Sequence, residues 1–254
     1  MIDLKNLTDL AKEASLAAGA EILKIYNSLD FGVESKSDDS PLTKADKAAH
    51  QVIVEALSKT NFPILSEEGR DISYEERKSY DYFWMVDPLD GTKEFIKKNG
   101  EFTVNIALIK KDKPVMGVVY APVLDWLYWG NESDGALKSE KGSVPVKLEI
   151  KDSDSINTIV ASRSHLSQET KEFIDQYQDA EVISMGSSLK LMLVAEGKAQ
   201  VYPRFAPTME WDTAAAHGII NAIGGKVNRY PDGSESLIYN KEDLLNPWFI
   251  CRIA

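Results

Sequence analysis

The feature that most constrains this sequence is an apolar run that ends in two acids and a glycine. Residues 83–86 are Phe-Trp-Met-Val, and Asp87, Asp90 and Gly91 follow directly. An apolar run bounded by turn-forming residues predicts a buried strand. Ionised carboxylates are seldom buried unless they are paired or bind a metal. The stretch therefore predicts a strand whose carboxyl end holds a hard cation such as Mg²⁺, which prefers oxygen ligands and keeps places for water and phosphate.

Composition excludes several classes of function. The chain has 254 residues and a formal net charge of −11, which argues against a surface that binds nucleic acid. Its one cysteine, Cys251, excludes an internal disulfide and fits a reducing cytoplasm. No apolar stretch is long enough to span a bilayer, so we expect no transmembrane segment. The first residues do not read as a signal peptide, and we expect a cytoplasmic protein.

The first half of the chain predicts helices followed by an antiparallel sheet. Apolar residues at helical spacing predict an amphipathic helix over 7–25 and a second one that starts near Asp46. A charged tip at 110–114 predicts a hairpin between two strands rich in Val, Ile and Thr. Besides the run at 83–86, the expected strands cover 62–65, 102–109, 115–121, 124–129 and 144–150.

The second half predicts alternating strands and helices. A polar stretch at 151–155 is the expected boundary, which gives an α+β subdomain over 1–150 with most of the acids and an α/β subdomain over 151–254. We expect two layered subdomains with a cleft between them. The expected strands are 158–161, 182–185 and 199–202, and the expected helices are 168–177, 188–196 and 211–223.

Three further acids have less certain roles on sequence alone. Asp212 opens an expected helix, where an aspartate usually caps the backbone amides. Asp46 and Glu67 could equally be solvated turn residues. Only the pair Asp87 and Asp90 favours a metal site, because a buried strand leads directly into it.

Other metal and phosphate motifs are absent from the sequence. A calcium-binding loop that starts at Asp87 would need oxygen ligands where Leu89 and Lys98 stand. The glycine-rich phosphate loops of nucleotide-binding proteins do not occur. His50 and His217 lie on expected helices, and no zinc-type cluster can be built from them.

With these motifs together, the chain resembles the inositol monophosphatase superfamily. The shared motifs are Asp87-Pro-Leu-Asp-Gly-Thr92, Thr43-x-x-Asp46, Glu67-Glu68 and Trp211-Asp212-Thr213-Ala214-Ala215. Further stretches are similar to one branch of it, the CysQ-type 3'(2'),5'-bisphosphate nucleotidases. These stretches are 93–96, 99–105, Ser162-Arg163-Ser164-His165, Gly186-Ser187-Ser188-Leu189-Lys190 and 202–205.

The resemblance implies a fold and a reaction. It implies a layered αβαβα sandwich, a mixed α+β and α/β architecture of the inositol monophosphatase/fructose-1,6-bisphosphatase type. It also implies a lithium-sensitive, magnesium-dependent phosphomonoesterase that removes the 3'-phosphate of adenosine 3',5'-bisphosphate to give AMP, a step linked to sulfate assimilation. The partner is then a small nucleotide. The resemblance leaves open peripheral attachment to the cytoplasmic face of an inner membrane, for which the sequence shows no anchor.

The resemblance also assigns roles to residues. Glu67, Asp87 and the Leu89 carbonyl would hold one Mg²⁺, and Asp87, Asp90 and Asp212 a second; a third, weaker ion would sit near Glu67. The scissile phosphate would contact Leu89, Asp90, Gly91 and Thr92, with Glu67 and Asp212 lining the same site. Gly91 lets the backbone approach an anion closely. We expect Asp46 to accept a hydrogen bond from the Thr92 hydroxyl, and this pair to orient and deprotonate the attacking water, so that Asp46, Thr92 and Glu67 form the catalytic set.

The nucleotide side of the site rests on fewer residues. By resemblance, Ser162, His165 and Lys190 would contact the ribose, the base and the 5'-phosphate, with Lys190 as a point charge. The alternatives are a solvated helix residue for Lys190 and a loop residue that caps the next helix for His165. An inositol or sugar phosphatase, and a nucleotide sensor without turnover, remain the alternative functions.

Overall fold

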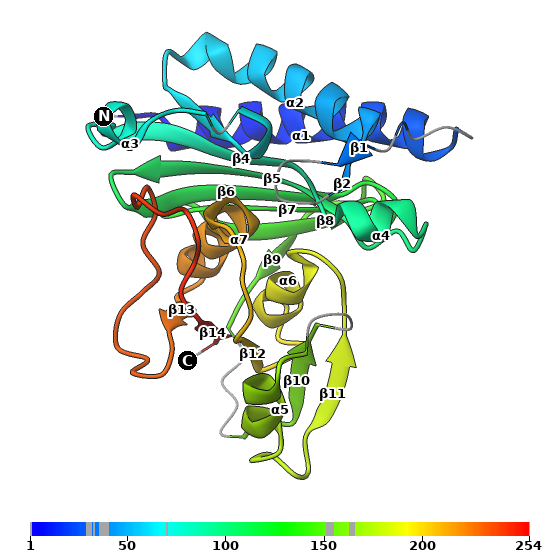
Figure 1. The fold of residues 1–254 in the computed structure, drawn as a ribbon, viewed down its shortest axis with the longest axis vertical. Helices are drawn as coiled ribbons and strands as arrows, with labels where there is room; N and C mark the ends of the chain where they lie inside the picture. Colours follow the sequence, from blue (N-terminus) through cyan, green and yellow to red (C-terminus); the bar gives the residue numbers. More distant parts are fainter. Residues whose placement is uncertain are drawn as a thin grey trace.

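The chain folds into five layers of alternating helices and sheets. The computed structural model describes residues 2–28, 32, 34–35, 41–69, 71–150, 155–162 and 166–253. Figure 1 shows α1 (Leu4–Tyr26) and α2 (Lys44–Leu57) on one face of a seven-stranded sheet. Helices α6 (Leu189–Ala195) and α7 (Glu210–Ala222) lie between this sheet and a five-stranded one, with α5 (Gln168–Ile174) on the far side (Figure 1). The predicted layered sandwich is confirmed.

The two outer helices begin earlier than the sequence indicated, because polar residues cap them. The Asp3 side chain accepts a hydrogen bond from the Asn6 amide at 3.0 Å, which starts α1 at Leu4. Thr43 caps α2 in the same way, so that helix starts at Lys44 rather than near Asp46. Across the described ranges, no helix combines the length and the apolar character needed to span a membrane.

The seven-stranded sheet contains the predicted hairpin and one strand that the sequence did not predict. All neighbouring strands are antiparallel except β3 and β4, which are parallel. The unpredicted strand is β8, and β9 is shorter than the expected 144–150. The order in the sheet follows the chain: β3 (Ile64–Ser66), β4 (Tyr82–Asp90), β5 (Thr103–Lys110), β6 (Lys113–Ala121), β7 (Trp126–Asn131), β8 (Gly135–Glu140) and β9 (Val146–Leu148).

The central strands of this sheet are buried on both faces. β4 is buried from Phe83 to Leu89, and β5 from Thr103 to Ile109. A sheet covered on both faces has nearly continuous apolar strands, which explains the uninterrupted apolar run at residues 83–86.

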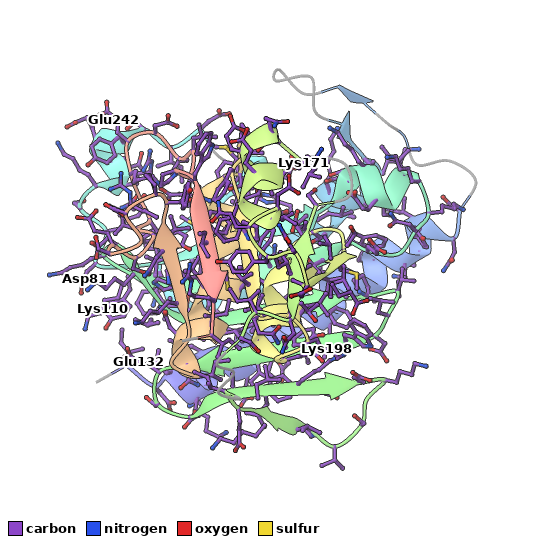
Figure 2. All side chains as sticks on the ribbon, turned by 90° about the horizontal axis from the view of Figure 1, so that it is seen from below. Asp81, Lys110, Glu132, Lys171, Lys198 and Glu242 are labelled. Atoms are coloured by element: carbon purple, nitrogen blue, oxygen red, sulfur yellow. The ribbon has the colours of Figure 1, made fainter. Side chains whose placement is uncertain are left out.

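The tip of the hairpin between β5 and β6 is exposed rather than buried. Lys110 lies at the edge of the molecule near Asp81 and Glu132 (Figure 2). The pKa of Lys110 is raised chiefly by its hydrogen bond with the Tyr82 side chain, and then by the charges of Glu132 and Asp81.

The five-stranded sheet is mixed. Its order is β11-β10-β12-β14-β13, with β10 parallel to both neighbours and β14 antiparallel to both of its own. The last two strands were not predicted. The bounds are β10 (Thr158–Ala161), β11 (Glu181–Ser184), β12 (Val201–Arg204), β13 (Lys226–Arg229) and β14 (Phe249–Arg252).

Short elements complete the described chain. The strands β1 (Glu34–Ser35) and β2 (Pro41–Leu42) pair antiparallel, and 3₁₀ turns follow α2 and β3. The remaining helices are α3 (Tyr74–Arg77) and α4 (Thr92–Ile96). The two sheets fall on either side of residue 150, but one hydrophobic core contains Met85 of the first sheet and Phe249 of the second. The subdomain boundary at 150 stays a prediction.

Helix α7 packs directly on the first sheet through two glycines. A Cβ at Gly117 of β6 would lie 1.9 Å from the Ala215 carbonyl oxygen, and one at Gly218 would lie 2.8 Å from the Met116 carbonyl carbon. Helix and strand backbones therefore touch without side chains between them. This contact sets the depth at which the first turn of α7 enters the molecule.

We predict that Gly117→Ala destabilises the fold strongly. The new methyl group meets helix backbone, which cannot move aside as a flexible side chain would, so we expect a loss of about 3 kcal/mol or more. Chemical denaturation measures the loss. Val146→Ala, on the exposed β9 edge, is the control and should change the free energy of unfolding by less than about 0.5 kcal/mol. A Gly117→Ala variant as stable as the wild type would contradict the direct contact.

Candidate active site

A bulge at the end of β4 separates the two acids of the central motif. Asp87 pairs with Asn105 and Asp90 with Thr103, so two residues of β4 face one residue of β5. Pro88 lies in this bulge, where its missing N–H breaks no ladder bond. The Leu89 amide donates to Asp87 Oδ1 at 3.0 Å. The strand thus continues through both acids, whereas the sequence indicated that it ended before them.

Gly91 then turns the chain into α4. Its φ is +93°, in the left-handed region that favours glycine. A Cβ there would lie 3.3 Å from the Glu101 carbonyl oxygen and from Phe102 Cβ. The short helix α4 follows and covers Thr92–Ile96. The tight turn leaves the backbone of Gly91 and Thr92 at the edge of a cavity.

Asp46 is fixed at the start of α2. Its Oδ2 accepts hydrogen bonds from the Thr43 amide at 2.7 Å and the Thr43 hydroxyl at 2.6 Å. Its Oδ1 accepts one from the Thr92 hydroxyl at 3.3 Å. The expected hydrogen bond between Thr92 and Asp46 is therefore present. It joins the first turn of α2 to the first turn of α4.

Asp212 reaches the same place from the other half of the chain. One oxygen of each of Asp87, Asp90 and Asp212 lies within 4.8 Å of the others. Asp212 also accepts a hydrogen bond from the Met209 amide at 2.9 Å, so it caps α7 as well. The capping role and the place in the cluster are compatible, because a carboxylate has two oxygens.

Burial and neighbouring acids raise the pKa of two residues of this cluster, Asp87 and Asp212. The pKa of Asp87 is well above its ordinary range because of burial, and then because of the charges of Glu67, Asp90 and Asp212. The pKa of Asp212 is raised by burial and by Asp90 and Glu67. Glu67 lies in the 3₁₀ turn after β3, outside the group of three but near enough to act on it. Buried like charges require a counterion, so this donor set fits hard divalent cations.

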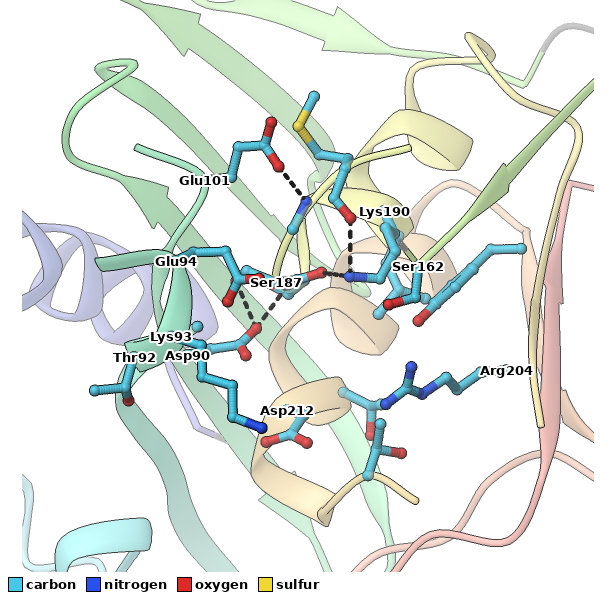
Figure 3. Close-up of a pocket in the computed structure, with 18 of the residues that line it drawn as sticks. Asp90, Thr92, Lys93, Glu94, Glu101, Ser162, Ser187, Lys190, Arg204 and Asp212 are labelled. Atoms are coloured by element: carbon cyan, nitrogen blue, oxygen red, sulfur yellow. Dashed lines mark hydrogen bonds between the residues drawn. The ribbon is translucent and has the colours of Figure 1, made fainter. Parts of the chain in front are cut away.

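A polar cavity of about 370 Å³ opens beside the acids. It lies where the parallel strands β10, β11 and β12 end, since Ser162, Met185 and Arg204 line it. Ligands of open sheets with parallel strands bind outside the carboxyl ends of those strands. Asp90, Asp212 and Lys190 all line this cavity, and Figure 3 shows Ser187 between Asp90 and Lys190.

Lys190 is buried at the wall of the cavity rather than solvated on a helix surface. Its ammonium group donates to the carbonyl oxygens of Ser187 at 2.6 Å and Met185 at 3.3 Å. Burial lowers the pKa of Lys190 to about 8, against the opposing charge of Asp90. The interpretation as a solvated helix residue is wrong, because α6 packs between the sheets and not on the surface.

The other expected nucleotide contacts are less defined. Ser162 lines the cavity directly after β10, and Arg204 lines it while donating to the Pro207 carbonyl at 2.9 Å. His165 lies outside the described residues. Several polar residues in the site received no role from sequence reasoning, although they stand in the quoted motifs: Glu94, Glu101, Thr103, Asn105, Ser187 and Ser188. Their signal in the sequence is their place in those motifs.

A buried polar network supports the first turns of α7. Glu210 is fully buried and accepts hydrogen bonds from the Asn240 amide at 2.6 Å and the Lys241 amide at 3.1 Å, and it forms an ion pair with the Lys241 ammonium group. Two turns further on, His217 Nδ1 lies 2.8 Å from the Tyr239 hydroxyl. The segment 236–246 thereby holds the helix that carries Asp212.

Comparison with known proteins places the chain in a family. The model of the inositol monophosphatase family matches residues 3–249, and the chain belongs to this family. The sequence is 46% identical over 250 residues to 3'(2'),5'-bisphosphate nucleotidase CysQ of Salmonella typhimurium, covering 97% of this chain and 98% of that protein. The CysQ of Buchnera aphidicola is 43% identical over 91% of this chain and 87% of that protein.

A solved structure agrees with the sequence comparison. The crystal structure of CysQ from Bacteroides thetaiotaomicron, described as a bacterial member of the inositol monophosphatase family, superposes with a TM-score of 0.88 at 49% identity. The match covers 98% of this chain and 97% of that one. The resemblance predicted from the motifs is confirmed. The roles of the individual site residues stay predictions.

We predict that His217 makes the fold sensitive to acid. Burial lowers its pKa to about 3, whereas unfolded histidine titrates near 6.5. Below pH 6.5, His217 binds a proton in the unfolded chain but stays neutral in the folded chain. The contribution of neutral His217 to the free energy of unfolding is therefore lost as the pH falls toward 3. Between pH 5.5 and 4.5 this residue should remove about 1.4 kcal/mol. His217→Gln should show a correspondingly shallower fall in the free energy of unfolding, and an unchanged slope would contradict the burial argument.

Proposed function

We propose that this chain is a magnesium-dependent phosphomonoesterase that converts adenosine 3',5'-bisphosphate to AMP and phosphate, in support of sulfate assimilation. The observation that carries the proposal is the meeting of Asp87, Asp90 and Asp212 beside a cavity that a buried lysine, Lys190, also lines. The acids can hold metal ions beside one phosphate of the substrate, and the lysine can pair with a second anionic group of the same substrate. The 3'(2'),5'-bisphosphate nucleotidase activity of the CysQ relatives supports the same substrate.

The acids divide into two sets of ligands. We assign Glu67, Asp87 and the Leu89 carbonyl to one Mg²⁺, and Asp87, Asp90 and Asp212 to a second, with a third and weaker ion near Glu67. When bound, the ions supply Lewis acidity that stabilises the charge on the attacking and leaving oxygens. Phosphate monoesters hydrolyse extremely slowly in water, so the site needs such a strong electrostatic contribution.

The protein's own proton acceptor is the pair of Thr92 and Asp46. Thr92 donates its hydroxyl proton to Asp46, which leaves a lone pair on the threonine oxygen free to accept a proton from water. As the water loses that proton to Thr92, the threonine passes its own to Asp46. Two hydrogen bonds from Thr43 hold the Asp46 carboxylate during this exchange. The pair thus orients the attacking water and accepts its proton.

The two ends of the substrate would bind to opposite sides of the cavity. Backbone groups of Gly91 and Thr92 would receive the scissile 3'-phosphate together with Leu89 and Asp90. Ser162, His165 and Lys190 would contact the ribose, the base and the 5'-phosphate. The volume of about 370 Å³ lies within the range of small-molecule sites, which supports a nucleotide-sized ligand.

A substrate panel tests this proposal against its two alternatives. Phosphate release is measured from adenosine 3',5'-bisphosphate, inositol 1-phosphate and fructose 1,6-bisphosphate, each with Mg²⁺ and with or without Li⁺. We expect the nucleotide to have the highest kcat/KM and lithium to inhibit. Preference for inositol or sugar phosphate would favour the related phosphatases. Tight nucleotide binding without phosphate release would favour a sensor.

We predict that Asp87→Asn abolishes turnover without unfolding the protein. The variant loses a ligand shared by both proposed ions, while the removal of a buried charge beside three other acids relieves repulsion. The melting temperature without Mg²⁺ should therefore match or exceed that of the wild type. Asp81→Asn, at the exposed start of the same strand region, is the control for activity. Near-normal turnover by Asp87→Asn would contradict the two-ion mechanism.

We predict that Lys190→Gln discriminates between substrates with and without a 5'-phosphate. A charge-assisted contact to a phosphate contributes enough that its loss should raise KM for adenosine 3',5'-bisphosphate about ten-fold. KM for adenosine 3'-monophosphate should stay within about two-fold, because that substrate has no group for the lysine. Lys171→Gln, on the exposed face of α5, is the control. Equal effects on both substrates would show that Lys190 has only a structural role.

A further inference from the structure

Every hydrogen bond that the described residues make to Asp90 ends on one of its two oxygens. The Ser187 hydroxyl donates to Oδ2 at 2.5 Å and the Ser188 amide at 2.6 Å. The Asn105 side-chain amide adds a longer contact of 3.5 Å to the same atom. Figure 3 shows Ser187 and Asp90 joined in this way at the edge of the cavity. The other oxygen, Oδ1, is left for a cation.

The side chains around Asp90 form a chain of hydrogen bonds that ends on its carboxylate. The Ser188 hydroxyl donates to Asn105 Oδ1 at 2.8 Å, which turns the Asn105 amide nitrogen toward Asp90. Ser187 donates its only hydroxyl proton to Asp90. Thr103 lies 2.5 Å from the Ser187 oxygen and 2.8 Å from the Ser188 oxygen, so its proton goes to one of these two. Thr103, Asn105 and Ser188 are buried, while Ser187 and Asp90 are half-buried at the edge of the cavity.

The loop that carries Ser187 is fixed from both sides. The Gly186 amide donates to Glu101 Oε2 at 2.8 Å, and a Cβ at Gly186 would lie 2.6 Å from the Glu101 carbonyl oxygen. Ser187 has a φ of +54°, which a residue with a side chain rarely adopts unless its surroundings impose it. On the other side, the Ser187 carbonyl accepts the hydrogen bond from Lys190. Ser187 thus joins the buried lysine and Asp90.

We propose that Ser187 is a positioning residue for Asp90: its hydroxyl holds Oδ2 so that Oδ1 faces the cation. This inference rests on the metal-dependent function proposed above and adds to it a contribution from the loop between β11 and α6. Residues that orient a metal ligand commonly change metal affinity or activity by about 10-fold to 100-fold when they are replaced. Ser187 acts through Asp90 and touches no reacting atom.

Two substitutions separate the hydroxyl from the backbone. Ser187→Ala and Ser187→Gly both remove the hydroxyl, but only glycine adopts a positive φ without steric strain. Mn²⁺ binding to the purified chain, followed by electron paramagnetic resonance, should weaken about ten-fold in both variants. The Mg²⁺ concentration for half-maximal phosphate release should rise by a similar factor. KM for adenosine 3',5'-bisphosphate at saturating Mg²⁺ should stay within about two-fold, because Lys190 keeps its place.

Ser184→Ala, on the exposed end of β11, is the matched control and should bind Mn²⁺ as the wild type does. Wild-type Mn²⁺ affinity in both Ser187 variants would overturn the positioning role while the phosphatase proposal stands. Weaker binding in Ser187→Ala alone would overturn it too, because the effect would then come from the backbone. A wild-type chain that neither binds Mn²⁺ nor releases phosphate would overturn the proposed function and this inference together.

Discussion

The gathering of like charges at one buried point is the constraint on which the rest of the structure depends. Asp87, Asp90 and Asp212 come from a central strand and from the start of a buried helix, and each would be less costly to bury alone. No apolar core holds such a cluster together by itself. The fold does so by anchoring each acid to backbone: Asp87 to the Leu89 amide, Asp90 to the Ser188 amide and Asp212 to the Met209 amide.

The same requirement explains why the two sheets share one core. Asp212 can meet the other acids only if α7 crosses the first sheet at a fixed depth, which the backbone contacts at Gly117 and Gly218 provide. The helix is then held at its start by Glu210 and further along by His217, both bonded to the segment 236–246. A one-residue shift of α7 would move the carboxylate by about 1.5 Å along the axis and about 100° around it. The cluster therefore depends on packing far from the cavity.

The sequence predicted what local patterns determine. Periodicity gave the outer helices and the central hairpin, and the apolar run gave β4 with its acids, because burial on both faces leaves a continuous signal. The short strands β13 and β14 were not predicted; β13 has one apolar residue among its four. The expected Thr92–Asp46 bond was predicted only through the family resemblance, since 46 positions separate the two residues. The contacts of Ser187 with Asp90 arise from tertiary structure alone, because 97 positions lie between them.

Charge balance links the two walls of the cavity. The chain carries a formal net charge of −11, yet its proposed substrate is an anion, so attraction has to come from inside the site. Lys190 is costly to bury as a cation, and the charge of Asp90 offsets part of that cost. Once a divalent ion shares the charge of Asp90, that compensation weakens, and an anionic group beside Lys190 restores it. The buried lysine is therefore best matched by a substrate that brings a second anionic group, which an inositol monophosphate lacks and a nucleoside bisphosphate supplies.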